Sequence, residues 1–571
     1  MKRMLTVSVI IALVMSIASF AFAADTFIKY PSNNWLRKTL SGTSFCYEYK
    51  DEALHVDKWN SYGRIILGYE SAGAYKTWDW NDTTSQVVMT EYAGDYVPTS
   101  DVTFWSDVVQ SERRVAYIYD FHGELNNLDT ATNGWVMREK TIYDNDGVTM
   151  KERYVYDASG LMVRDDHAAD NRYYTYVYHS APLASNIHYK SEYELSSGNL
   201  ISTYEYISSE FYVRRDPDGT IYTITLDGAT SYTNSQLDPD GTFTIYQRDA
   251  SHVFQGAIKY LPNGDVERLN ATWGLIGKTE ASAFLKGVNI PWVSYGYGIG
   301  AAPVTGTHVG LSSKLHDLYA KLDGRKGDYA RVFLFSDLRA GIEFDASGNP
   351  TGFTAKVYED MQALLDAAKA LGIKLMPVLF DYKIADGISV GEAEHADLIN
   401  DAAKRLALIN IIDDFIAHFG ADSSIYAWDI MNEPEVSIEK GATNLANLQA
   451  FVGAFTTMIH ANAPGAKVTV GSLNRGNVAN WMGLGLDFYQ YHYYNYMEAN
   501  GYPLDYKAAD LGLDKPVIVG ELEPTDVLNK LNTVSANGYA GALFWEDGSG
   551  FNISAADYAL IQDWGFGTSY T

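Results

Sequence analysis

The chain has 571 residues, enough for two or three domains, and 47% of them are hydrophobic, as in globular proteins. Its 71 acidic residues outweigh 43 basic ones, which gives a formal net charge of −28. This charge disfavours binding to nucleic acids or to anionic membrane surfaces and suits a neutral ligand.

The first 23 residues have the pattern of a secretory signal peptide. Lys2 and Arg3 precede an apolar run over Leu5–Phe20, and Ala21-Phe22-Ala23 offers a small-residue cleavage site. The run is short for a membrane span, and no second long apolar stretch follows it. We therefore expect a mature protein without membrane insertion, secreted to the periplasm or the extracellular space. The single cysteine, Cys46, leaves no internal disulfide.

Residues 24–272 are predicted to form a β-rich repeat region. Strand-like runs such as Thr220–Thr225 and Thr242–Tyr246 alternate with residue pairs that favour tight hairpin turns, because a positive φ is cheap there. These pairs are Asp146-Gly147, Ser159-Gly160, Ser197-Gly198, Asp218-Gly219, Asp240-Gly241 and Asn263-Gly264. The last four glycines are 21, 22 and 23 residues apart. One hairpin per repeat of about 22 residues predicts a stacked β array.

One piece of this region, Tyr154-Val-Tyr-Asp-Ala-Ser-Gly160, resembles the tyrosine–aspartate (YD) repeats of secreted bacterial proteins. Such arrays serve as spacers, shells or sugar-binding surfaces, and the sequence leaves these three roles open.

Residues 273–571 are predicted to form a (β/α)₈ barrel. Strand-like and helix-like runs alternate, which is typical of a parallel sheet. The clearest helix is Lys356–Leu371, with an apolar face and Gly372 as its stop. Further helices are expected over Asp397–Phe419, Asn444–Asn462, Thr525–Asn537 and Ala555–Trp564. The eight predicted strands are Phe284–Asn289, Ala330–Phe335, Lys374–Leu379, Ile425–Ile430, Lys467–Gly471, Phe488–His492, Pro516–Gly520 and Gly541–Trp545.

Two carboxylates fall at strand ends of this barrel. Glu433 follows the fourth strand and Glu521 follows the seventh. In a (β/α)₈ barrel the active site lies at the carboxyl ends of the strands. Cleavage of a glycosidic bond needs two carboxyl groups, one to protonate the leaving oxygen and one to attack or stabilise the sugar cation. The sequence therefore predicts a glycoside hydrolase.

The same segments resemble clan A of the glycoside hydrolases, with family 5 (cellulases and mannanases) as the nearest relative. The resemblance covers roughly residues 283–571. It rests on Asn432-Glu433-Pro434 and Glu521, and on further matches at other strand ends. These are Gly287-Val-Asn289 followed by Trp292, Arg331 on strand two, His492 and Tyr494 after strand six, and Trp545 on strand eight.

The resemblance implies a role for each of these residues. Glu433 would be the general acid/base and Glu521 the nucleophile of a retaining reaction, with a covalent glycosyl-enzyme intermediate. Asn432 would bond the sugar 2-hydroxyl, and His492 would hold the acid/base or its neighbour. Arg331 and Tyr494 would keep the nucleophile ionised. Trp545 would floor the sugar subsite, with Trp292 as a further wall. The substrate would be a β-linked polysaccharide or oligosaccharide, cleaved by a β-glucanase-like or β-mannanase-like enzyme.

Simpler roles stay open for several of these residues. Arg331 could form a barrel-interior ion pair, His492 could be a core histidine, and Trp545 could serve packing alone. Asp429 is expected to be structural. Glu435 is expected at the surface or in a subsite, and Glu523 near the start of a helix.

The sequence departs from family 5 at one point. Members usually carry a histidine after strand three or just before strand four, and here Phe380-Asp381-Tyr382 follows the third strand. Asp381 or Tyr382 is expected to line the pocket instead.

Two other functions remain possible. The protein could be a non-catalytic carbohydrate-binding or cell-envelope protein, or an enzyme that trims the cell's own exopolysaccharide. No cofactor and no metal are expected, because an Asp-rich turn such as Asp216-Pro-Asp218-Gly219 is more often only a turn. The sugar, the linkage, endo or exo action and the oligomeric state are not determined by the sequence.

Overall fold

A computed structural model describes the strands between residues 26 and 143, and residues 144–564 apart from 145–147, 179–186, 229, 280–283, 302–308, 327, 386–394 and 547–550. The predicted signal peptide and the Asp146-Gly147 turn lie outside the described residues. The chain divides into two compact units between Glu205 and Tyr206. In the described part of the chain, no helix is long and apolar enough to cross a membrane.

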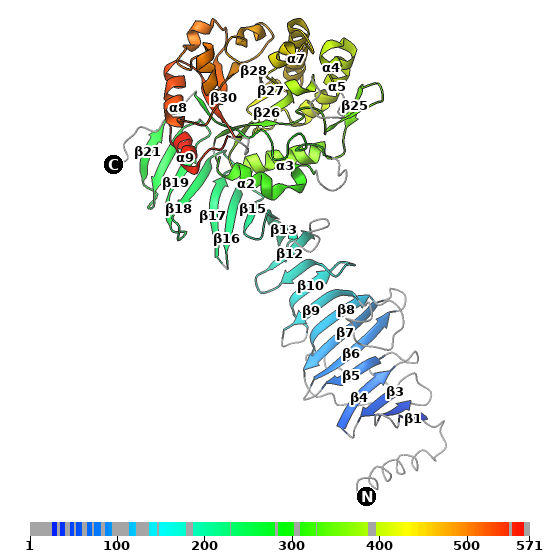
Figure 1. The fold of residues 1–571 in the computed structure, drawn as a ribbon. Helices are drawn as coiled ribbons and strands as arrows, with labels where there is room; N and C mark the ends of the chain where they lie inside the picture. Colours follow the sequence, from blue (N-terminus) through cyan, green and yellow to red (C-terminus); the bar gives the residue numbers. More distant parts are fainter. Residues whose placement is uncertain are drawn as a thin grey trace, which may run out of the picture. The chain divides into compact units, whose positions relative to one another are not determined.

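The first unit is an antiparallel sheet in which each strand pairs with the next one along the chain (Figure 1). Aromatic and charged side chains cover one another on it: Tyr173 and Tyr193 stack at 4.7 Å, and the Arg164 guanidinium lies 4.0 Å from the Tyr173 ring. Its strands are β1 (Thr26–Tyr30), β2 (Trp35–Thr39), β3 (Cys46–Lys50), β4 (Ala53–Trp59), β5 (Ile65–Glu70), β6 (Ala74–Asn81), β7 (Gln86–Ala93), β8 (Arg113–Asp120), β9 (Val136–Tyr143), β10 (Met150–Tyr156), β11 (Met162–His167), β12 (Arg172–Tyr178), β13 (Ile187–Glu194) and β14 (Leu200–Tyr206).

The second unit begins with another antiparallel run of strands. These are β15 (Phe211–Arg215), β16 (Ile221–Asp227), β17 (Thr230–Leu237), β18 (Phe243–Arg248), β19 (Phe254–Tyr260), β20 (Val266–Asn270) and β21 (Leu275–Thr279). The predicted turn glycines Gly198, Gly219, Gly241 and Gly264 all have positive φ, from 74° to 95°. Each therefore closes a hairpin, and the predicted repeat of one hairpin per period is confirmed.

A closed barrel of eight parallel strands follows, as predicted. Every strand begins and ends within two residues of its predicted limits. The strands are β22 (Leu285–Asn289), β23 (Tyr329–Phe333), β26 (Lys374–Asp381), β27 (Ala427–Asn432), β28 (Lys467–Ser472), β29 (Tyr489–Tyr493), β30 (Val517–Leu522) and β31 (Gly541–Trp545). A separate hairpin is formed by β24 (Ile342–Phe344) and β25 (Pro350–Phe353).

All five predicted helices are present, but one of them is divided, and the helices over Leu315–Asp323 and Glu435–Glu439 were not predicted. The expected helix Asp397–Phe419 is broken at Asp401, whose backbone is extended and whose carboxylate accepts hydrogen bonds from the amides of Ala403 and Lys404, which starts a new helix. The helices are α2 (Leu315–Asp323), α3 (Val357–Ala370), α4 (Asp397–Asn400), α5 (Ala402–Phe419), α6 (Glu435–Glu439), α7 (Leu445–Asn462), α8 (Val527–Ala536) and α9 (Ala555–Asp563). Short 3₁₀ segments are η3 (Leu311–Ser313), η4 (Tyr382–Ile384), η5 (Val478–Trp481), η6 (Asn495–Asn500) and η7 (Ala508–Leu511).

Within the second unit, the antiparallel strands pack directly on the barrel. Ile207, Val213 and Ile221 belong to the same buried apolar cluster as α2 and α3. The Phe243 ring lies against Gly372, so close that a Cβ there would sit 2.4 Å from it. The Ser235 hydroxyl donates to the Ala370 carbonyl at 3.3 Å. The barrel and strands β15–β21 therefore share one core.

Candidate active site

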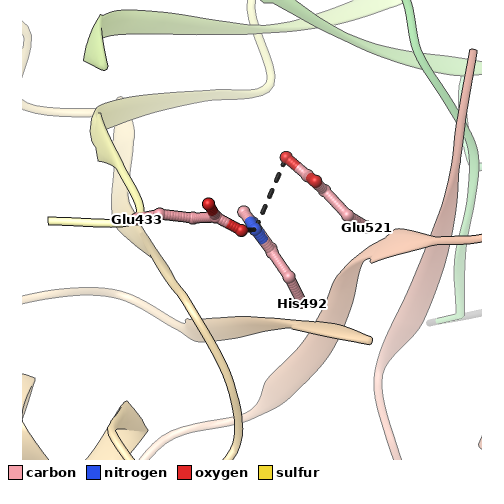
Figure 2. Close-up of side chains that lie close together, drawn as sticks. All are labelled: Glu433, His492 and Glu521. Carbon is pink, nitrogen blue, oxygen red and sulfur yellow. Dashed lines mark hydrogen bonds and ion pairs between the residues drawn. The ribbon is translucent and has the colours of Figure 1, made fainter. Parts of the chain in front are cut away.

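The structure brings Glu433 and Glu521 together at the carboxyl ends of the barrel strands. Figure 2 shows both carboxylates directed toward His492, which comes from β29 between them. The His492 Nδ1 atom lies 2.8 Å from Glu433 Oε1 and 3.5 Å from Glu521 Oε1. One oxygen of each glutamate and the imidazole nitrogen all lie within 4.8 Å of one another. A single sugar linkage can therefore reach both carboxyl groups.

The backbone at Glu433 explains how its side chain is aimed. Glu433 follows the last residue of β27 and has a left-handed φ of 44°, which is rare for a residue with a side chain. Its amide donates to the Gly471 carbonyl of β28 at 2.6 Å, and Pro434 then starts α6. Strain of this kind persists only where the surroundings fix it and is common at active sites.

Arg331 is the centre of a buried hydrogen-bond network under the two glutamates. Its guanidinium donates to Asp429 Oδ2 at 2.9 Å, Asn289 Oδ1 at 3.0 Å, Glu521 Oε1 at 2.8 Å and Asn432 Oδ1 at 2.9 Å. Because Arg331 is completely buried, these partners satisfy a charge that would otherwise be costly. Arg331 is thus both a barrel-interior ion pair and a direct contact of Glu521, and Asp429 holds it in place.

Asn432 is oriented from two sides. Its Oδ1 accepts from Arg331, and its Nδ2 donates to Asp381 Oδ2 at 2.9 Å. Asp381 ends β26, at the point where the sequence departs from the histidine that is usual in family 5. Burial raises the pKa of Asp381 to about 7. The carboxyl group at this strand end therefore fixes which way the Asn432 amide faces.

The two glutamates have different surroundings. Glu433 is 17% exposed, and burial raises its pKa to about 7. Burial also raises the pKa of Glu521, but the Arg331 guanidinium and the Tyr494 hydroxyl, which donates to Oε2 at 2.6 Å, oppose that rise. Burial lowers the pKa of His492 to about 4, so its imidazole is neutral near pH 7. The two carboxyl groups therefore differ in their direct partners: Glu521 contacts the Arg331 guanidinium and the Tyr494 hydroxyl, and Glu433 contacts the neutral His492 ring.

Glu433, His492 and Glu521 also have the spacing of a metal site. The guanidinium 2.8 Å from Glu521 Oε1 would repel a cation, and Tyr494 already donates to the other oxygen. These contacts favour a proton-handling pair over a metal centre.

Aromatic side chains cluster around Trp545 at the end of β31. The Trp545 ring meets Trp292 at 6.1 Å and Phe333 at 6.1 Å, both edge to face. Trp292 itself packs edge to face against Tyr295 at 4.6 Å. Edge-to-face packing on Trp292 and Phe333 therefore fixes the Trp545 ring at the end of β31. Its role as the platform on which a sugar ring stacks stays a prediction.

Two expectations about neighbouring glutamates were wrong. Glu435 is only 3% exposed, and its carboxylate accepts hydrogen bonds from the Trp481 indole at 2.9 Å and the Leu473 amide at 3.0 Å. It is a buried anchor between α6 and the chain after β28. Glu523 does not lie at the first turn of α8, which begins at Val527, and its carboxylate accepts from the Asn495 amide at 3.1 Å.

One member of the network was missed by the sequence analysis. Gln490 donates to Asp429 Oδ2 at 2.5 Å and is completely buried. It lies two residues before His492 on β29, and residues two apart on a strand face the same side. This two-residue spacing from His492 was the signal in the sequence that could have identified Gln490 as a member of the network.

We expect the Arg331→Lys variant to lose about 100-fold or more in kcat with a smaller change in KM. An ammonium group cannot bond Asp429, Asn289, Glu521 and Asn432 at once, so the Glu521 carboxylate and the Asn432 amide would both lose their alignment. Steady-state kinetics on a soluble substrate tests this. Lys286→Arg, which replaces a lysine bonded to carbonyls of the C-terminal helix, is the control for an Arg/Lys exchange elsewhere in the barrel. Equal losses in both variants would contradict the assigned contact.

Comparison with known proteins gives sequence relatives but no matching family model. The chain is 25% identical over 345 residues to the mannan endo-1,4-β-mannosidase of Mytilus edulis, a match that covers 51% of this chain and 90% of that protein. It is 24% identical over 325 residues to the mannan endo-1,4-β-mannosidase of Cryptopygus antarcticus, covering 48% and 82%. Among solved structures, the β-1,4-mannanase of the sea hare Aplysia kurodai has 24% identity and a TM-score of 0.43, with 53% of this chain and 96% of that chain covered.

The sequence matches confirm the predicted resemblance to the glycoside hydrolases that include mannanases. The resemblance of the N-terminal region to YD repeats stays a prediction.

Proposed function

We propose that this protein is a retaining glycoside hydrolase that cleaves β-1,4-linked mannan, with Glu433 as acid/base and Glu521 as nucleophile. The observation that carries the proposal is the short distance between the two carboxyl groups: one oxygen of Glu433 and one oxygen of Glu521 lie within 4.8 Å of each other. Retaining enzymes place their carboxyl groups about 5–5.5 Å apart, whereas inverting enzymes leave room for a water molecule. The mannan substrate is inferred from the named activity of the relatives.

The first step breaks the glycosidic bond. A Glu521 oxygen attacks the anomeric carbon, and Glu433 gives its proton to the leaving oxygen, so that a covalent sugar ester forms on Glu521. In the second step Glu433 takes a proton from water, and the resulting hydroxide attacks the anomeric carbon and releases Glu521. Glu433 ends with its proton restored. Two displacements on the same carbon leave its configuration unchanged.

The neighbouring groups serve these steps. Arg331 and Tyr494 stabilise the Glu521 carboxylate before attack and after release. Asn432, fixed by Arg331 and Asp381, presents its amide for a sugar hydroxyl. The His492 ring is neutral and lies 2.8 Å from Glu433 Oε1. It therefore positions the acid without a positive charge that would favour the ionised form of Glu433.

The pKa of Glu433 predicts the alkaline limit of activity. The acid must be protonated for the first step, and its pKa is raised to about 7, so kcat should fall as pH rises through about 7. The acidic limit belongs to Glu521, which must be ionised. Wild-type pH profiles on a soluble manno-oligosaccharide, whose leaving oxygen needs the acid, and on an activated aryl glycoside, which does not, test the assignment. The alkaline limb near pH 7 should appear with the oligosaccharide and be lost with the aryl glycoside, and an equal limb on both substrates would contradict it.

A polysaccharide panel tests the reaction itself. We expect reducing ends from galactomannan and glucomannan, and little from cellulose or xylan. NMR of the first-formed product should show the β anomer before mutarotation. An α anomer would contradict the retaining mechanism, and binding of mannan without any product would favour the non-catalytic alternative.

We also propose that residues 1–23 direct secretion. The pattern Ala21-Phe22-Ala23 supports cleavage before Ala24. N-terminal sequencing of protein recovered from the periplasm or medium should begin at Ala24, and an uncleaved N-terminus would contradict this part of the proposal.

A further inference from the structure

Five hairpin turns between β15 and β21 share one hydrogen-bond pattern. In each, the first residue accepts a bond from the amide three residues later and donates to the carbonyl four residues later. The turns begin at Asp216, Asp238, Asp249, Leu261 and Asn270. The fourth residue of each turn has a left-handed backbone, with φ between 61° and 95°.

Glycine occupies this fourth position in three of the turns and aromatic residues occupy it in two. The three glycines are Gly219, Gly241 and Gly264, and glycine adopts a left-handed backbone easily because it has no side chain. His252 (φ 61°) and Trp273 (φ 63°) take the same conformation with a large side chain. Histidine tolerates it moderately well, but a bulky residue such as tryptophan there is a real outlier. An outlier of this kind suggests function.

Burial does not compensate for the strain at Trp273. One face of its ring stacks on Phe254 at 5.0 Å and 25°, and Tyr246 meets it edge-on at 6.0 Å. The side chain nevertheless stays 49% exposed, and Leu275 and Ile276 beside it are 57% and 58% exposed. Glycine at this position would remove the strain, so folding alone does not explain the tryptophan.

The two aromatic turns lie on the same edge of the sheet. They join β18 to β19 and β20 to β21, whereas the three glycine turns join β15 to β16, β17 to β18 and β19 to β20 at the opposite edge. The His252 ring also stacks on a neighbour, Tyr232, at 4.3 Å and 17°. Consecutive hairpins on one edge therefore each present an aromatic pair.

We propose that this aromatic edge, formed by Tyr232, His252, Phe254 and Trp273, binds a neutral polysaccharide chain. A sugar ring has a flat face of C–H groups that packs on an exposed aromatic face, and its hydroxyls need polar partners at the rim. The His252 imidazole, which stacks on Tyr232 and whose Nε2 lies 3.4 Å from Asp227 Oδ2, is the polar group within these aromatic pairs. The net charge of the whole chain, −28, disfavours a polyanionic ligand.

This inference rests on the proposed function for the identity of the polymer. The edge is built from residues of β17–β21 and their turns, none of which belongs to the catalytic network. Its role is to hold the enzyme on insoluble mannan while the barrel cleaves accessible chains. Binding at the edge and turnover in the barrel should therefore be separable.

The test uses the full chain and replaces the strained tryptophan by the residue of its sister turns. Trp273→Gly should weaken retention on insoluble mannan at least about fivefold, because a stacked ring is lost. The midpoint of thermal unfolding should not fall, since the turn is relieved of strain. Hydrolysis of soluble manno-oligosaccharides should stay unchanged. Trp273→Tyr, which keeps an aromatic face, should retain most of the binding.

Ile276→Thr is the matched control, because it removes an equally exposed apolar side chain without touching a ring. An equal loss of binding in this variant would overturn the proposal in favour of general adhesion. Unchanged retention of Trp273→Gly would overturn it as well. So would a wild-type dimer that Trp273→Gly converts to monomer with polysaccharide affinity intact, because the edge would then be a subunit interface.

The binding measurement is repeated with cellulose and chitin and in a Glu521→Gln background. Absence of wild-type turnover on every substrate, with Trp273-dependent retention preserved, would contradict the proposed function but not the aromatic edge. Turnover of soluble substrate, with equal retention of wild type and Trp273→Gly on insoluble mannan, would contradict the aromatic edge alone.

Discussion

Replacement of Glu521 by alanine is expected to lower kcat/KM on mannan by at least about 10⁴-fold, because the first displacement loses its nucleophile. The space left beside Arg331 can admit a small anion, so azide should restore turnover of an activated aryl glycoside. Azide then attacks from the face that Glu521 occupied and should yield the α-glycosyl azide. Its detection by NMR would also show that the variant is folded.

The matching experiment on Glu433 separates the two roles. Glu433→Ala should still form the sugar ester from an activated substrate, and azide should displace it to give the β-glycosyl azide. Opposite anomers from the two variants are therefore expected, and exchanged anomers would reverse the roles of the two glutamates. Glu523→Ala is the control, since its carboxylate contacts only the Asn495 amide among the described hydrogen bonds of that side chain. It should stay within about twofold of wild type.

Removal of residues 206–279, which include strands β15–β21, is expected to unfold the barrel. Ile207, Val213, Ile221 and Phe243 bury their side chains in contact with barrel elements. At roughly 1.5–3 kcal/mol for each side chain, their loss would cost roughly 6–12 kcal/mol, which is comparable with the total stability of about 5–15 kcal/mol of an ordinary domain. We therefore propose that residues 206–279 belong to the catalytic folding unit.

Two truncated chains test this boundary. Residues 206–571 should be soluble, unfold cooperatively and hydrolyse soluble mannan, whereas residues 273–571 should aggregate or remain inactive. A folded and active 273–571 fragment would contradict the shared core. In the full chain, Phe243→Ala should lower stability by about 3–5 kcal/mol. Val253→Ala, at a side chain that is 57% exposed, should change it by less than about 0.5 kcal/mol.

The barrel could be predicted in detail because its pattern is local. Strands that are buried on both faces read as short apolar runs, and the helices between them show one apolar face. Turn chemistry likewise marked the hairpins, because glycine reports a left-handed backbone wherever it is the fourth residue of the turn. The break at Asp401 was missed because a single capping aspartate is a weak signal inside a long apolar periodicity.

The site was predictable to the extent that barrel topology places strand ends together. Glu433, Glu521, Arg331, Asn432, His492 and Tyr494 could be brought to one place from strand order alone. Which groups bond to one another could not. Glu435, two residues after Glu433, turns into the core toward Trp481, and Asp381 accepts a hydrogen bond from Asn432 on the neighbouring strand.

The eight-strand barrel, the repeated hairpins and the two carboxylates at strand ends can be inferred from the residues alone, since each depends on residue periodicity along one segment. The bonds of Arg331, the raised pKa of Glu433 and the joining of β15–β21 to the barrel core become visible only in the folded chain. Burial and pairing depend on segments far apart in the chain, and no local pattern encodes where such segments meet.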